Sequence, residues 1–220
     1  MNAREIYNVI LVRLHIRKVL PAKYIHGKKC VDCQEKLVPL CSKGIYNSSG
    51  GELYGRQSVV AKIVQIADVL ENRGLAIKVF EFYRGKDKQS AMRDSQKNKI
   101  QELYPKYTDR QIISLLNKRI SPEGGGHQTG GAIDLTICNQ DGEELDMGTS
   151  YLEFNESTPT SSRKLTSAQK KNRALLLSVM KDAGFVNYPL EWWHYSYGDK
   201  MWAAYSNSST AIYGDISNYI

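Results

Sequence analysis

The pattern of hydrophobic and polar positions is clearest between about residues 57 and 83. Apolar residues recur at helical spacing between Val59 and Leu70, and Gly74 stands where a glycine commonly ends a helix. The mainly apolar segment Leu75–Tyr83 then predicts a strand, with Ile77 and Val79 toward the core. This part of the chain is therefore expected to form a helix followed directly by a strand.

The second half of the chain continues to interleave helices and strands. Polar stretches over about 88–103 and 108–118 are predicted to be helical, and Ala132–Cys138 predicts a strand that ends in an Asp-Gly turn. A capping box, Thr166–Gln169, opens a further helix. Because helix crossovers are too few for a doubly wound sheet, we expect an α+β fold with a small, mostly antiparallel sheet flanked by helices.

The first 56 residues are harder to interpret. They are basic and turn-rich near their end, so we expect an irregular N-terminal lobe over 1–56 and a core over 57–220, together one compact domain. The chain has 220 residues, of which 41% are hydrophobic and 24% are charged. These values are ordinary for a globular protein and exclude a disordered, collagen-like or fibrous chain.

The sequence indicates neither a membrane span nor export. No run of about 18 apolar residues is present, so no spanning helix is expected. The apolar run Val9–Val12 is cut by Arg13 and is too short for an export signal. We therefore expect a cytoplasmic protein with no membrane partner, whose four cysteines stay reduced.

Three cysteines and a histidine lie close together in the first part of the chain. His26, Cys30, Cys33 and Cys41 could form a structural zinc site, because thiolates and imidazole are zinc ligands. The spacing matches no common zinc finger, and reduced structural cysteines are the competing interpretation. The sequence favours reduced thiols and leaves a second, structural zinc ion as the weaker hypothesis.

The net charge of +7 first suggests a nucleic-acid partner, but its distribution changes that view. Residues 1–56 and 84–119 each hold 10 basic and 4 acidic residues, whereas residues 120–162 hold 8 acidic residues and no basic one. The aromatic residues are not interleaved with Lys and Arg as a stacking surface for nucleic acid requires. We therefore expect no nucleic-acid partner, and an active site in the acidic block.

Two short motifs each combine a histidine with a carboxylate. His127 and Asp134 are seven residues apart among glycines, and Glu191 precedes His194 by three residues. Two histidines and one carboxylate form a catalytic zinc set that leaves a fourth position for water, and a further glutamate could take a proton from that water. Each motif alone could be a turn or part of the core. Together, in a chain with four histidines, they favour a metal site.

These motifs resemble those of a known family. The pattern H-x2-G-x-A-x-D from His127 to Asp134, completed by E-x-W-H from Glu191 to His194, is similar to that of the zinc D-alanyl-D-alanine dipeptidases and related D,D-carboxypeptidases. The resemblance extends over about residues 55–205. Further segments similar to the dipeptidase branch are Tyr83-Arg84-Gly85, Leu145–Thr149 and Leu190–Tyr195.

The resemblance implies a role for each matching residue. His127, Asp134 and His194 would bind one catalytic Zn²⁺ at the sheet. Glu191 would be the general base that activates the zinc-bound water and returns the proton to the leaving amine. Arg84 would hold the scissile carbonyl and stabilise the oxyanion, a task that suits its planar guanidinium.

Two positions depart from the family pattern. Gly125 stands where the family usually has a serine, two residues before the first histidine. Leu152 stands where the dipeptidase branch has an acidic residue for the free amino group of the substrate, although Glu153 and Glu156 are near in sequence. The resemblance therefore implies an intact catalytic apparatus and leaves the need for a free amino group open.

The leading hypothesis is a zinc dipeptidase whose substrate is the small dipeptide D-Ala-D-Ala, with a role in cell-wall biogenesis or degradation. The alternative is a D,D-carboxypeptidase or peptidoglycan endopeptidase that acts on longer cell-wall peptides. A protein that keeps the zinc fold without catalysis is a third hypothesis, which the presence of both Arg84 and Glu191 disfavours.

Overall fold

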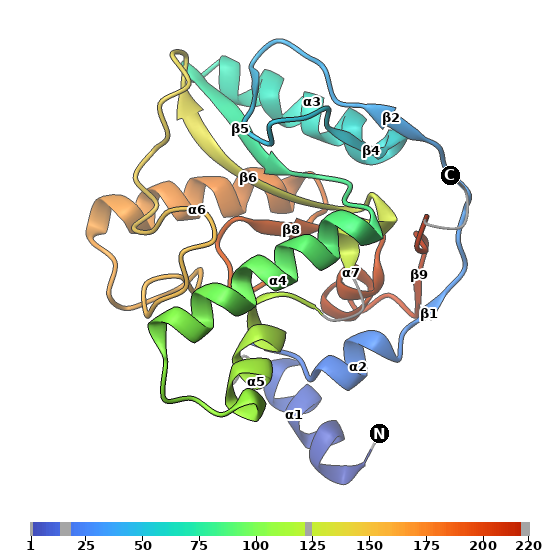
Figure 1. Cartoon of the computed structure of the whole chain (residues 1–220). Coiled ribbons are helices and arrows are strands. Elements are labelled where there is room, and N and C mark those ends of the chain that lie inside the picture. The colour runs from blue at the N-terminus through green and yellow to red at the C-terminus, as the bar shows by residue number, and fades with distance from the viewer. Residues whose placement is uncertain (1, 14–18, 122–124, 217–220) are drawn as a thin grey trace.

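The computed structural model describes residues 2–13, 19–121 and 125–216 (Figure 1). Its helices are α1 (Ala3–Arg13), α2 (Ala22–His26), α3 (Gln57–Glu71), α4 (Lys86–Leu103), α5 (Asp109–Arg119), the 3-10 helix η1 (Gly126–Thr129), α6 (Ser167–Asp182) and α7 (Lys200–Tyr205). Its strands are β1 (Lys29–Cys30), β2 (Leu37–Pro39), β3 (Ile45–Asn47), β4 (Tyr54–Arg56), β5 (Leu75–Glu81), β6 (Ala132–Asn139), β7 (Val186–Asn187), β8 (His194–Ser196) and β9 (Thr210–Ala211). Over these ranges, no helix is both long and apolar enough to cross a membrane.

A five-stranded sheet with the order β3-β5-β6-β8-β7 forms the centre of the molecule. β3 runs parallel to β5, and the other neighbouring strands are antiparallel. The expected α+β fold, with a small and mostly antiparallel sheet flanked by helices, is therefore confirmed.

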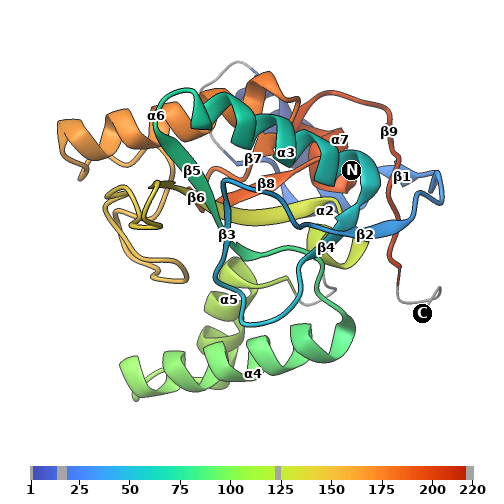
Figure 2. The ribbon, with the colours of Figure 1, turned by 90° about the horizontal axis from the view of Figure 1, so that it is seen from above.

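The pleat of β6 separates the main core from the opposite face of the sheet. Ile133, Leu135 and Ile137 are fully buried and pack with apolar side chains of α3 and α6. Asp134 and Thr136 alternate with them and must point to the other face. α4 and α5 lie on that second side (Figure 2). A polar residue on β6 is thus directed toward the space between the sheet and α4–α5.

The periodic segments form the elements that their patterns predict. The helix expected between Val59 and Leu70 is α3, and the strand expected from Leu75 is β5. The predicted helices near 88–103 and 108–118 are α4 and α5, and β6 covers the expected strand. α6 begins with the predicted capping box, in which Thr166 and Gln169 cap each other's backbone.

The first 56 residues contain short elements that attach to the rest of the chain at several points. β3 adds an outer strand to the central sheet, beside β5. β1 pairs in parallel with β9, so that the segment near Cys30 lies beside the segment near Ala211. β2 pairs with β4 just before α3 begins. The division of the domain at residue 56 stays a prediction.

Candidate active site

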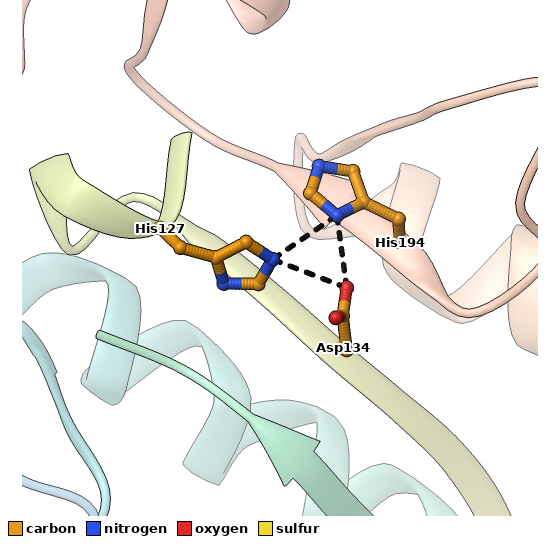
Figure 3. Close-up of side chains that lie close together, drawn as sticks. All are labelled: His127, Asp134 and His194. Carbon is orange, nitrogen blue, oxygen red and sulfur yellow. Dashed lines mark hydrogen bonds and ion pairs between the residues drawn. The ribbon is translucent and has the colours of Figure 1, made fainter. Parts of the chain in front are cut away.

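Three side chains from three separate elements meet beside the sheet (Figure 3). His127 comes from η1, Asp134 from β6 and His194 from β8, and the last two stand directly opposite each other in the antiparallel pair. Asp134 Oδ1 lies 2.8 Å from His194 Nδ1 and 3.3 Å from His127 Nε2, and the two ring nitrogens are 3.3 Å apart. Within the described ranges this is the one group of three or more metal-binding side chains that converge in this way.

The donor set and its spacing fit a zinc ion. Nitrogen and oxygen ligands at about 2.0–2.1 Å from zinc in tetrahedral geometry lie roughly 3.3 Å from one another. The second ring nitrogen of His127, Nδ1, donates a hydrogen bond to the Phe82 carbonyl oxygen at 2.7 Å. A carbonyl can only accept, so this bond fixes the tautomer and leaves Nε2 as the free ligand atom.

The charges in the cluster are strongly coupled. Burial opposes the charged form of Asp134, but the adjacent His127 and His194 hold its pKa well below its usual range. Burial likewise opposes protonation of His194, yet its hydrogen bond to Asp134 raises its pKa. A buried carboxylate that stays ionised between two imidazoles is suited to bind a cation.

The glycine-rich sequence around His127 allows close packing beneath the cluster. A Cβ atom on Gly126 would lie 2.0 Å from Asp199 Oδ2, so a side chain cannot be accommodated there. That carboxylate is itself held in place by the Ser196 hydroxyl at 2.7 Å and caps α7. The sequence hypothesis that these glycines let His127 approach the carboxylate of Asp134 is consistent with this packing.

Glu191 lies in the turn just before β8, within the same cleft as the cluster. Its side chain is only 9% exposed. Burial, reinforced by the charge of Asp134, raises the pKa of Glu191 to about 8. A carboxylate with a raised pKa readily takes up a proton, as a group that accepts a proton and then returns it must do.

Arg84 follows β5 and is also buried in the cleft, with 6% of its side chain exposed. Its backbone N–H donates to the His127 carbonyl oxygen at 3.2 Å, which ties the end of β5 to η1. Its Nη1 lies 2.8 Å from Met92 Sδ and 3.8 Å from a Glu81 carboxylate oxygen. Its Nε is buried without a hydrogen-bond partner in the described structure.

The five candidate residues line a single cleft of about 390 Å³. α4 and α5 contribute one wall, through Met92, Asn117 and Arg119. α2 also lines the cleft, through Ala22, Ile25 and His26. The structure therefore brings together Arg84 and Glu191 with His127, Asp134 and His194, as the resemblance implied.

The second zinc site considered from the sequence finds no support in the arrangement of its residues. His26, Cys30, Cys33 and Cys41 do not form a converging group among the residues that the structure describes. All four cysteines of the chain are free thiols, and Cys33 and Cys41 are exposed. His26 instead faces the rim of the cleft.

Neither of the two acidic residues that follow Leu152 is among the residues that line the cleft. Glu153 accepts hydrogen bonds from the Ser150 N–H and the Asn155 side chain, and Glu156 pairs with Lys164 at 3.6 Å. Leu152 itself lines the cleft. Neither glutamate therefore takes the place of an acidic residue at position 152.

One polar contact of the cluster lies outside the predicted motifs. The Tyr151 hydroxyl donates to Asp134 Oδ2 at 2.9 Å, on the side of the carboxylate that faces away from the histidines. The hydrophobic pattern of the sequence does not point to Tyr151, because this residue lies in an irregular segment between β6 and α6. Its position immediately before Leu152, in a segment that resembles the family, is the one available signal.

Comparison with known proteins identifies the family. The family model Peptidase_M15, described as D-ala-D-ala dipeptidase, matches residues 48–211. A D-alanyl-D-alanine dipeptidase from Synechocystis sp. is 27% identical over 231 residues, which cover 86% of this chain and 92% of that protein. Another, from Enterococcus faecium, is 26% identical over 153 residues, covering 67% of this chain and 75% of its own length.

Solved structures show the same fold at low sequence identity. A mutant of the vancomycin resistance D,D-pentapeptidase VanY in complex with Zn(II) aligns with a TM-score of 0.51 at 15% identity, covering 85% of this chain and 91% of its own. VanYB in complex with D-alanine-D-alanine aligns with a TM-score of 0.50 at 13% identity, covering 84% and 93%. Since the family model spans most of the sequence, the chain is a member of the Peptidase_M15 family of peptidases.

Proposed function

We propose that the protein is a zinc-dependent peptidase that hydrolyses the dipeptide D-Ala-D-Ala to two molecules of D-alanine. The observation that carries this proposal is the convergence of His127, Asp134 and His194 in one cleft with Glu191 and Arg84. The dipeptidases among its relatives support the choice of substrate. The cytoplasmic location expected from the sequence stays part of the same proposal.

His127, Asp134 and His194 would hold the zinc ion through Nε2, Oδ1 and Nδ1, the atoms that face one another. When bound, zinc acts as a Lewis acid that polarises the scissile carbonyl and lowers the pKa of water toward about 7. The buried carboxylate of Glu191 takes the proton from the attacking water and transfers it to the nitrogen of the departing D-alanine.

Arg84 has a separate task in this scheme. Its guanidinium lines the cleft together with the metal-binding side chains, so its positive charge can stabilise the carbonyl oxygen as negative charge develops on it. Its backbone bond to the His127 carbonyl holds it at a constant position relative to the metal ligands. The cleft thus supplies a base, an oxyanion donor and a metal-binding set within one buried site.

The test is the variant Glu191→Gln, measured with D-Ala-D-Ala and with zinc analysis of the same sample. We expect about one zinc per chain in both proteins, and a loss of kcat of about 10²–10⁴-fold in the variant, because only the proton acceptor is removed. Glu156→Gln is the matched control, since Glu156 is exposed and pairs with Lys164 outside the cleft. Near-full activity of Glu191→Gln would remove Glu191 as the base.

A second candidate function rests on Leu152. An apolar residue lines the cleft at the position where the dipeptidase branch has an acidic one, while Glu153 and Glu156 make other contacts. Such a cleft favours substrates whose amino group is acylated, as in a D,D-carboxypeptidase or peptidoglycan endopeptidase. Hydrolysis of D-Ala-D-Ala compared with its N-acetyl form and a pentapeptide stem separates the two functions: preference for the free dipeptide supports the dipeptidase.

A further inference from the structure

Tyr151 makes the two oxygens of the Asp134 carboxylate different from each other. Oδ1 faces the ring nitrogens of His127 and His194, whereas Oδ2 accepts a hydrogen bond of 2.9 Å from the Tyr151 hydroxyl. Tyrosine keeps its proton at neutral pH and is therefore a donor to this carboxylate. Tyr151 does not itself line the cleft, so this contact acts on Asp134 and not on a substrate.

The Tyr151 ring is held from two sides. It stacks on Phe80, with ring centroids 4.5 Å apart and planes at 9°. It also meets the edge of Trp193, with centroids 5.6 Å apart. Two aromatic contacts leave the ring little freedom to turn, so the hydroxyl is presented to Asp134 in one direction.

The segment that carries Tyr151 is fixed to α6 and to the turn before β8. The buried Arg173 of α6 donates to the carbonyl oxygens of Met147 and Pro159, each at 2.7 Å. The Trp192 indole N–H donates to the Thr149 hydroxyl at 2.8 Å. These bonds clamp the chain on both sides of Tyr151.

The backbone changes direction immediately after Tyr151. Leu152 has a φ of +59°, a left-handed backbone conformation that is unfavourable for any residue other than glycine. The turn lets Leu152 line the cleft while the preceding Tyr151 points to Asp134. The left-handed residue therefore sets the directions of both side chains.

We infer that Tyr151 is a positioning residue for the metal centre, which holds Asp134 as a ligand through Oδ1 alone. This inference rests on the proposed zinc site. A carboxylate with both oxygens free can rotate or bind through both of them, which would use a coordination position needed for water and substrate. Hydrogen-bonding partners of metal ligands commonly contribute 10–100-fold to metal affinity.

The experiment compares zinc binding by the wild type, Tyr151→Phe and Tyr195→Phe, using competition with a chromogenic chelator. Tyr151→Phe keeps the stacked ring and removes only the hydroxyl, so we expect its zinc dissociation constant to rise by roughly 10–100-fold. Tyr195→Phe is the matched control, because Tyr195 is buried and its hydroxyl has no partner in the described structure. It should bind zinc as the wild type does.

Two further measurements separate positioning from a general structural effect. Thermal unfolding of the metal-free proteins should show that Tyr151→Phe and Tyr195→Phe are both folded. Cobalt(II) spectra should differ between wild type and Tyr151→Phe, because the ligand field changes when Asp134 Oδ2 loses its hydrogen bond from Tyr151. Equal zinc affinity and equal cobalt spectra for all three proteins would overturn the inference alone. Failure of the wild type to bind zinc would overturn the proposed function with it.

Discussion

Single hydrogen bonds decide which atoms of the candidate site are available to a metal. The Phe82 carbonyl accepts a hydrogen bond from Nδ1 of His127 and so leaves Nε2 to face Asp134. The Tyr151 hydroxyl donates a hydrogen bond to Oδ2 of Asp134, and Oδ1 faces the histidines. The residue types alone allow several arrangements, and these neighbours select one of them.

The backbone conformation at position 125 explains why a glycine stands there. Gly125 has φ +91° and ψ −159°, a combination that is almost restricted to glycine. Gly125→Ser would introduce the residue that the family usually has, yet we expect it to lower the free energy of unfolding by roughly 1–3 kcal/mol, because the side chain strains this backbone. Urea denaturation measures the change.

The control for this prediction is Gly51→Ser. Gly51 has no positive φ, and a Cβ atom there would meet nothing within 4 Å. Its stability should therefore change little. Equal stability of the two serine variants would show that the backbone at position 125 adapts without strain.

At the scale of elements, a buried arginine joins segments that lie far apart in sequence. Arg56, at the end of β4, donates to the Thr129 carbonyl oxygen at the end of η1 and to the Gly214 carbonyl oxygen. It also pairs with Asp32 at 3.0 Å. The helix that carries His127 is thus linked to both the first part and the last part of the chain.

Glu35 also links the first part of the chain to α3 and to the last part of the chain, and its charge makes the stability of this link depend on pH. It accepts hydrogen bonds from the Ser58 N–H at 2.9 Å and the Tyr213 hydroxyl at 2.6 Å. Burial alone would raise the pKa of Glu35, but the hydrogen bonds from Ser58 and Tyr213 hold it below the ordinary value of 4.5. A carboxylate with a lowered pKa stabilises the fold above its ordinary pKa, and this contribution is lost as the pH falls through the lowered value.

We therefore expect Glu35→Gln to lower the free energy of unfolding by about 1 kcal/mol at neutral pH, a value reduced for partial exposure. The difference from the wild type should shrink toward zero as the pH falls below 4.5. Urea denaturation of both proteins over this pH range provides the measurement. Glu102→Gln, at an exposed position of α4, should show no such pH-dependent difference. A difference that is constant with pH would contradict the role of the Glu35 charge.

At the scale of the whole molecule, the candidate metal centre connects η1, β6 and β8. The three ligands are adjacent only when these elements are assembled, so zinc should bind the folded chain in preference to the unfolded one. Zinc at about 100 times its dissociation constant should add about 2.7 kcal/mol of stability. For a chain of this length this corresponds to a rise in Tm of roughly 5–10 °C.

Calorimetry of the metal-free protein with and without added zinc checks this prediction. His194→Ala should lose most of the zinc-dependent rise in Tm, whereas His26→Ala, at the rim of the cleft, should keep it. The opposite result, with the rise lost only in His26→Ala, would place the zinc ion at the N-terminal cysteines instead.

Much of the fold was accessible from local patterns. α3 to α6, β5 and β6 follow from apolar period, mainly apolar segments and capping boxes, which depend on residues a few positions apart. α1 and the short strands before α3 were not predicted, since they contain few residues or weak periods. β3 in particular is a strand because it pairs with β5, which lies about 30 residues later.

Period, capping and ligand type are properties of short segments, and they indicated the class of fold, its longer core elements and a candidate metal set. Arg84 became a candidate through the family resemblance alone. Only the tertiary structure decided that Tyr151 contacts Asp134, that Arg84 keeps an unpartnered donor, and that Leu152 rather than Glu153 faces the cleft. These relations depend on side chains brought together from distant elements and on backbone direction at single residues. A linear pattern does not contain that information.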